Sequence, residues 1–191
     1  MKKLKFIIPV LIVIMLIYFL GGYRFTALSA AKSNVYLPKD AQLMEQYDSD
    51  SSVIFLFKSD KEKMYRTVLA EKKAFFYQSR LSTYIPYNSD EIQTVGGISY
   101  TTKNNMASLL SVISYDEEVA YIEAGIEPYR ESKEIKKGEL TTFLFSTNNQ
   151  IDQLHAVATN KEGEALYYYG YPKNAPTINL NKDLKWYKID R

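Results

Sequence analysis

The stretch "VIFLFKSDKEKMYRTVLAE" (residues 53–71) decides the fold class, because it alternates short apolar runs with a charged turn. Val53 to Phe57 is apolar at every position, which predicts a strand buried on both faces. "SDKEK" is typical of a turn, and "MYRTVLAE" is typical of the next strand. A helix over 64–81 is the alternative, but Lys72 falls where its apolar face should continue. The stretch therefore favours antiparallel β structure.

The same pattern recurs along the rest of the chain, where runs rich in Val, Ile, Tyr and Phe are separated by turn residues. We expect strands in "AFFYQS" (74–79), on both sides of the acidic turn in "SLLSVISYDEEVAYIEAG" (108–125), in hairpins about Gly138 ("KEIKKGELTTFLFS", 133–146) and Gly163 ("LHAVATNKEGEALYYYG", 154–170), and in "DLKWYKID" (183–190). Seven or more short strands predict one antiparallel β-sandwich-like or partly open barrel domain over 36–191. Leu43, Met44 and Tyr47 have helix-compatible spacing and predict one short helix near the start of this domain.

The N-terminal segment has no charged side chain from Phe6 to Tyr23. A helix over 6–23 would be roughly 27 Å long, close to the hydrocarbon thickness of a bilayer, and Pro9 in its first turn is tolerated. Basic residues dominate the tail at 1–5, and positive charge is retained on the cytoplasmic side. We expect a single-pass transmembrane helix at 6–23 that binds the lipid bilayer, with the N-terminus in the cytoplasm, a tether at 24–35 and an extracytoplasmic domain.

A cleavable signal peptide is the alternative for the same segment. "ALSAA" (27–31) offers the small residues Ala27 and Ser29 beside a cut, and cleavage would give a secreted domain. Against cleavage, the apolar core is longer than most signal peptides carry, and the cut would lie beyond Arg24 and Phe25. The sequence favours the uncleaved anchor at the cell membrane.

Charge and cysteine content exclude several classes of function. The chain has 24 basic and 22 acidic residues, and four of the basic ones (Lys2, Lys3, Lys5 and Arg24) lie in the anchor region, which leaves 20 against 22 outside it. Such a balance argues against a nucleic-acid partner. The absence of cysteine excludes disulfides, thiolate metal sites and a cysteine nucleophile, and it favours a bacterial surface over a secreted animal domain.

Candidate catalytic and metal-binding residues are sparse. His155 is the only histidine, and it falls mid-strand with Asp152 nearby but without a "GxSxG" turn to present a nucleophile. The acidic run at 116–118 is typical of a solvated turn. "DSDSS" (48–52) lacks the glycine and glutamate of a calcium loop, and "VGGIS" (95–99) lacks phosphate-loop spacing and indicates a turn or bulge. We therefore predict no catalytic, cofactor-binding or metal residues and no cofactor.

"GEALYYYGYP" (163–172) is the strongest candidate for recognition. In a strand, Tyr167, Tyr169 and Tyr171 share one face, and Trp186 and Tyr187 would extend it. These five aromatic residues form the predicted recognition surface, for a sugar or for a partner's aromatic side chains. The alternative is structural, because tyrosine suits a half-buried pleated surface.

Four stretches, "TVGGIS", "SYDEEVAYIEAG", "EIKKGE" and "EALYYYGYP" with "DLKWYKI", resemble uncharacterised small single-pass membrane-anchored proteins of Gram-positive bacilli with a β-rich extracytoplasmic domain. The resemblance covers most of the chain after the anchor. It implies the same topology and location, and it implies no activity, cofactor or site residue.

The sequence as a whole favours a non-enzymatic, membrane-anchored protein that binds or modulates another envelope protein or a wall polymer. The alternative is a hydrolase acting on cell-wall material through acidic residues such as Glu118 and Glu123.

Overall fold

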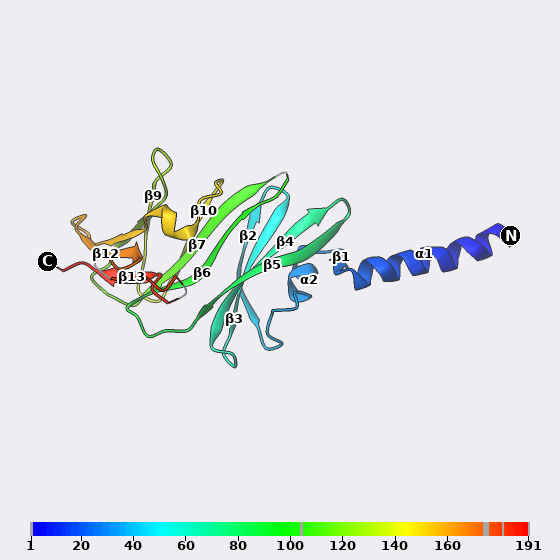
Figure 1. The fold of residues 1–191 in the computed structure, drawn as a ribbon, viewed down its shortest axis with the longest axis horizontal. Coiled ribbons are helices and arrows are strands. Elements are labelled where there is room, and N and C mark those ends of the chain that lie inside the picture. Colours follow the sequence, from blue (N-terminus) through cyan, green and yellow to red (C-terminus); the bar gives the residue numbers. More distant parts are fainter. Residues whose placement is uncertain (1, 104, 174–175, 181, 191) are drawn as a thin grey trace. The chain divides into compact units, whose positions relative to one another are not determined.

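The computed structural model describes residues 2–103, 105–173, 176–180 and 182–190 (Figure 1). It is mainly β with an antiparallel half-barrel sheet, which confirms the predicted fold class at that level. The described helices are α1 (Lys2–Leu20), α2 (Ala27–Lys32) and the 3-10 helix η1 (Ile151–Leu154). The described part of the chain divides into two compact units: unit 1 comprises 2–62 and 66–82, and unit 2 comprises 63–65 and the described residues between 83 and 190.

The described strands are, in chain order, β1 (Tyr23–Arg24), β2 (Gln42–Ser49), β3 (Ser52–Ser59), β4 (Met64–Lys73), β5 (Phe76–Pro86), β6 (Ile92–Thr101), β7 (Met106–Ser114), β8 (Tyr121–Ala124), β9 (Glu131–Glu134), β10 (Leu140–Phe145), β11 (Val157–Thr159), β12 (Ala165–Gly170) and β13 (Lys185–Lys188). The two strands predicted from 53–71 are β3 and β4, so that prediction is confirmed. The alternative helix over 64–81 is wrong, because these residues form β4 and the start of β5.

Unit 1 is built on a sheet with the strand order β1-β5-β4-β3-β2. β3 is buried at most positions, as its apolar sequence predicts. Helix α2 packs onto the sheet through Ala30 and Ala31, which are fully buried beside Phe55 and Phe57. Alanine allows this close approach because its side chain is a single methyl group. The helix begins after Thr26, whose hydroxyl caps it by accepting a hydrogen bond from the Ser29 amide at 3.2 Å.

Two segments of unit 1 differ from their predicted conformation. The expected tether at 24–35 contains α2, and its alanines belong to the core. The expected helix around Leu43, Met44 and Tyr47 is strand β2, paired with β3. The pairing shifts register between Leu43 and Glu45, so Met44 sits at a bulge. A bulge adds one residue to the strand, which allows Met44 and Tyr47, three residues apart, both to be half-buried.

The N-terminal segment forms helix α1, with Pro9 inside it. Of the helices in the described part of the chain, none has both the length and the apolar character needed to cross a membrane. The transmembrane span expected at 6–23 therefore stays a prediction.

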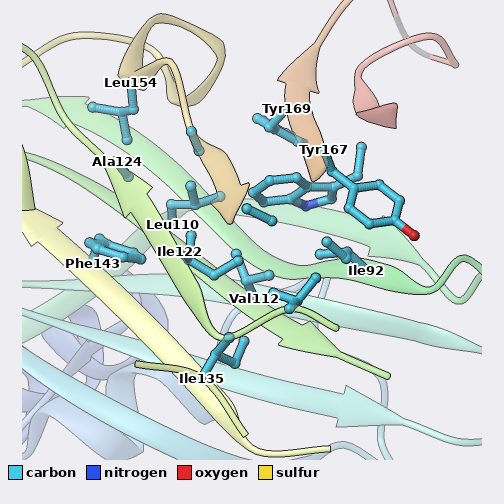
Figure 2. Close-up of a cluster of buried hydrophobic side chains, with 14 of the residues drawn as sticks. Ile92, Leu110, Val112, Ile122, Ala124, Ile135, Phe143, Leu154, Tyr167 and Tyr169 are labelled. Atoms are coloured by element: carbon cyan, nitrogen blue, oxygen red, sulfur yellow. The ribbon is translucent and has the colours of Figure 1, made fainter. Parts of the chain in front are cut away.

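Unit 2 contains two antiparallel sheets around one core. The first has the strand order β10-β7-β6, and the second has the order β13-β12-β11-β8-β9. Residues of both sheets meet in one buried cluster, in which Leu110 and Phe143 come from the first sheet and Ile122 and Tyr169 from the second (Figure 2). The core of unit 2 therefore joins its two sheets.

The hairpin predictions for unit 2 have mixed outcomes. β11 and β12 pair about a turn in which Gly163 has a φ of 82°, which confirms the hairpin there. Gly138 also has a positive φ, of 76°, but β9 pairs with β8 whereas β10 pairs with β7. The predicted hairpin about Gly138 is therefore wrong, because its two strands belong to different sheets. The adjacent glycines of "VGGIS" lie beside a register shift in β6 between Thr94 and Gly96, as expected for a bulge.

The sequence pattern placed His155 in the middle of a strand, and that prediction is wrong. His155 is the exposed residue that caps the end of η1, with a φ of 45° and a ψ of 46° in the left-handed region. β11 begins two residues later, at Val157. Leu154, on one side of His155, ends η1, and Val157, on the other side, begins β11. Their apolar side chains resemble the alternating pattern of one continuous strand, which is why that pattern placed His155 wrongly.

Candidate functional site

The candidate site is a groove along strand β6, one of the two edge strands of the three-stranded sheet of unit 2. Two adjoining hollows, of about 450 and 560 Å³, make up this β6 groove. They share five lining residues, which are Thr83, Gly97, Ile151, Leu180 and Leu184. The other lining residues come from β5, β6, η1, β12 and β13, and from the loops that carry Asn88, Asp90, Asn148, Gln150 and Tyr171. Each hollow has the size of a binding pocket for a small ligand or a few residues of peptide.

The groove follows the edges of two extended segments. Gly97–Thr101 of β6 are five consecutive residues, and all of them line the second hollow. Thr83–Pro86, at the end of β5, are likewise consecutive and line the first hollow. Successive side chains of a strand point to opposite faces, so a hollow lined by a consecutive run lies beside the strand's edge. Edges carry backbone donors and acceptors, which is the chemistry that recognises another extended chain.

Two aromatic residues that are both hydrogen-bonded to Thr94 form the wall at one end of the groove. The rings of Tyr169 and Trp186 lie 5.5 Å apart at 47°, and both side chains are buried. The indole nitrogen of Trp186 donates to the Thr94 hydroxyl at 3.1 Å, and the Tyr169 hydroxyl is also hydrogen-bonded to Thr94. Thr94 on β6 thus orients two rings from the other sheet, and these rings give the groove a fixed apolar wall.

The charged side chains of the groove line its two hollows and are separate from the buried aromatic pair. Asp90 lines the first hollow together with exposed Lys185, and Asp152 lines the second. Burial raises the pKa of Tyr169 well above its usual range, and the negative charge of Asp152 acts in the same direction. Burial and Asp152 also raise the pKa of Tyr171, which lines the second hollow. The Tyr171 phenol lines the second hollow and can offer a hydrogen bond to a ligand, whereas the buried Tyr169 hydroxyl is already hydrogen-bonded to Thr94.

The segment that carries η1 is held closely against β6. A methyl group added at Gly97 would lie 2.8 Å from the Cδ1 atom of Ile151, so the end of the Ile151 side chain would have to shift to accommodate it. Ser99 donates from its hydroxyl to the carbonyl oxygen of Asn149 at 2.8 Å, and the Ser108 hydroxyl donates to the same oxygen. This side of the groove is therefore preformed.

The five residues of the predicted recognition surface do not form one exposed row. Tyr167, Tyr169 and Trp186 are buried, with 5–6% of each exposed, and belong to the core of unit 2. Figure 2 shows Tyr167 and Tyr169 in this core. Of the five, Tyr169, Tyr171 and Trp186 line the groove. Tyr187 lies on the opposite face of β13, where its ring stacks on Tyr168 at 5.4 Å.

Tyr167 has a different environment from the groove residues. Its hydroxyl lies within hydrogen-bond distance of the Glu91 and Asp116 carboxylates, at 2.7 Å from Asp116. Burial, followed by these two acceptors and their charges, raises the pKa of Tyr167 well above its usual range. Lys188 lies 3.7 Å from Glu91 and 5.4 Å from the Tyr167 ring. The phenol ties β12 to the residues that precede β6 and follow β7, so its role is structural.

The acidic residues considered for catalysis are not brought together. Glu118 lines a hollow of about 300 Å³ beside Asp116 and Tyr167, whereas Glu123 on β8 pairs with Arg130 at 3.4 Å. Glu117 pairs with Lys137 at 2.6 Å, which lowers the pKa of its carboxyl. Within the described residues, no group of three or more acidic or histidine side chains could hold a metal ion.

Sequence reasoning missed Thr94, the strand edges and the η1 side of the groove. The paired glycines at 96–97 were the available signal, because adjacent glycines within a strand mark a bulge or a close approach.

Comparison of the chain with protein-family models, with characterised proteins and with solved structures finds no match. The geometry and chemistry of the groove are therefore the basis for assigning a function.

Proposed function

We propose that the protein is a non-enzymatic binding protein held at the cell membrane, and that its β6 groove binds an extended peptide segment of another envelope protein. The observation that carries the proposal is the consecutive lining of the groove by Gly97–Thr101. The Gly97 carbonyl oxygen already accepts a hydrogen bond from the Thr83 hydroxyl at 2.5 Å. An extended peptide placed there would pair with the strand edge through backbone groups beyond that oxygen and fit alternate side chains into the two hollows.

The chemistry of the groove supports an extended, partly apolar ligand. Ile92, Ile151 and Leu184 supply apolar surface, and the buried rings of Tyr169 and Trp186 cannot reorient to stack on a sugar. Asp152 in the second hollow, whose lining contains no basic residue, favours a ligand with a basic side chain there, because opposite charges raise the association rate and fix the register. These features favour a peptide over a wall polysaccharide.

The membrane location is supported by the N-terminal helix. Its described side chains between Ile8 and Leu20 are apolar and exposed, from 44% at Tyr18 to 83% at Leu20. A helix that is apolar on all sides needs to bury its surface in lipid or in protein. With the basic tail retained inside, such an anchor would place the β-rich part outside the cell.

The test uses the full chain reconstituted in lipid nanodiscs and the fluorescence of Trp186, the only tryptophan. The probe is a blocked peptide of about seven residues that alternates valine with threonine and carries one lysine. We expect saturable binding that shifts the Trp186 emission, because the indole lines the groove. The same peptide with alternate amides N-methylated should bind at least about tenfold more weakly, because it has lost its backbone donors.

A pair of variants locates the binding. Thr83 lines both hollows, so Thr83→Arg should fill the groove and weaken binding by about tenfold or more. Ser132→Arg places the same side chain at an exposed position of β9 and should leave binding unchanged. Equal binding by Thr83→Arg and the unsubstituted chain would contradict the proposal.

A further inference from the structure

The β4–β5 hairpin of unit 1 has an unusual tip. Two residues connect its strands, Ala74 with a φ of 55° and Phe75, whose side chain is 88% exposed. A solvent-facing phenylalanine at the outermost point of a tight turn makes no contribution to a core. Exposed apolar surface that is rimmed by polar residues is typical of a contact with a membrane or a partner.

The tip lies beside the end of helix α1. Strand β1, which follows α1, pairs with β5, where Tyr23 lies opposite Gln78. The Gln78 side-chain amide donates to the carbonyl oxygen of Gly21 at 2.8 Å. The ring of Phe76 lies 5.3 Å from that of Tyr18, so α1 and the hairpin are joined by direct contacts.

Aromatic rings surround this junction and leave an apolar hollow. Phe76 also packs against Tyr23 at 6.4 Å and against Phe25 at 5.2 Å, and Phe25 is 67% exposed. These rings and the side chains of α1 line a hollow of about 570 Å³, whose walls are almost wholly apolar. Tyrosine and other aromatic side chains are enriched where a protein crosses the boundary between lipid and water.

Positive charge accompanies the aromatic rings. Lys72 and Lys73 are exposed immediately before the tip, and Lys73 pairs with Glu71 at 2.5 Å. Arg24 donates to the carbonyl oxygen of Phe19 at 2.7 Å, at the end of α1, and its guanidinium lies 3.9 Å from the Phe19 ring centroid. A cationic rim around an apolar tip complements anionic lipid headgroups above acyl chains.

We propose that the β4–β5 tip is a second membrane contact, which inserts Phe75 into the headgroup region of an anionic bilayer beside the end of α1. The apolar hollow at the junction takes part of a lipid acyl chain. The contact fixes unit 1 against the membrane surface at a second point beside α1. This inference rests on the membrane placement of α1 in the proposed function.

The absence of cysteine from the chain provides a clean test. Phe75→Cys is labelled with an environment-sensitive fluorophore in the full chain, in vesicles of phosphatidylcholine with about one third phosphatidylglycerol. Lys61→Cys is the matched control, because it is exposed in the turn at the other end of β4, roughly 30 Å away along the strand. Val13→Cys, on α1, reports on the helix separately.

We expect the label at 75 to be quenched by nitroxide lipids and shielded from aqueous iodide, and the label at 61 to show the reverse. A label at 13 in lipid with a label at 75 in water would overturn the tip contact while leaving the anchor intact. A label at 13 in water would overturn the membrane placement itself.

As a second measurement, Lys72→Gln should lower the ratio of lipid-buried to water-exposed label at 75 about fivefold, whereas Lys61→Gln should leave it unchanged. No change in Lys72→Gln would contradict the electrostatic part of the contact.

Discussion

The indole nitrogen of Trp186 and the hydroxyl oxygen of Thr94 lie 3.1 Å apart, although the two residues are 92 positions apart in the chain. This hydrogen bond joins β13 of one sheet to β6 of the other, and both residues are buried. It fixes the aromatic wall of the groove against the edge strand.

Thr94→Val should therefore destabilise the protein. The substitution keeps the shape of the side chain but leaves the buried indole N–H without its acceptor, at a cost of about 1–3 kcal/mol. Urea unfolding followed by Trp186 fluorescence measures the loss. Thr94→Ser retains the hydroxyl and should recover most of the stability, and equal losses in the two variants would show that the hydrogen bond is unimportant.

The Tyr167 hydroxyl should make stability dependent on alkaline pH. Because the folded state raises the pKa of this phenol above its usual value of 10.0, the stabilisation is fully present below about pH 10 and is lost as the unfolded chain ionises above it. Tyr167→Phe lacks the hydroxyl bonded to Glu91 and Asp116 and should be less stable at pH 7 by about 1–3 kcal/mol.

The difference between the Tyr167→Phe variant and the unsubstituted chain should shrink as pH rises above about 10. Three other tyrosines whose pKa is raised are present in both proteins, so their contributions to the pH dependence cancel in this difference; they are Tyr169, Tyr171 and Tyr187. Equilibrium unfolding at a series of pH values checks this, and a difference that stays constant or grows would contradict the assignment.

Helix α2 should behave as part of the core of unit 1. Ala31 is fully buried, so Ala31→Leu should cost about 1–3 kcal/mol by overpacking. Lys32→Leu adds a side chain of the same size at the neighbouring, exposed position and should change stability by less than about 0.5 kcal/mol. Thermal unfolding monitored by circular dichroism distinguishes the two, and similar midpoints would indicate a loose tether after all.

Two glycines with positive φ should differ in their sensitivity to substitution. A methyl group at Gly163 meets nothing within 4 Å, so Gly163→Ala should cost only the backbone strain of about 1–2 kcal/mol. At Gly125 the methyl carbon would lie 2.7 Å from the carbonyl oxygen of Tyr129, so Gly125→Ala should cost more. Urea unfolding of both variants tests the ranking, and equal costs would contradict the close contact.

Most strands were predictable because their signal is local. The apolar run at 53–57 and the turn about Gly163 specify conformation through neighbouring residues. The signal failed at Met44, where a bulge produced a helix-like spacing, and about Gly138, where pairing depends on distant strands. Turn chemistry indicates where a chain reverses, but it does not say which strands pair.

The groove could be predicted only in part. Alternation correctly placed Tyr167 and Tyr169 on one face of β12, but a single strand does not reveal which face is buried. The groove itself is assembled from 83–90, 92–101, 148–152, 169–171, 180 and 184–186, and no local pattern reports that these segments meet. Trp186 was predicted as a recognition residue, whereas Thr94, which orients it, carries no signal of its own.

Amide hydrogen exchange of the full chain in nanodiscs, with and without the valine–threonine peptide, tests the central claim most directly. If the peptide adds to the edge of β6, amides within 97–101 should exchange more slowly in its presence, while those of the β4–β5 hairpin stay unchanged. Unaltered exchange at 97–101 under saturating peptide would contradict the proposed binding mode.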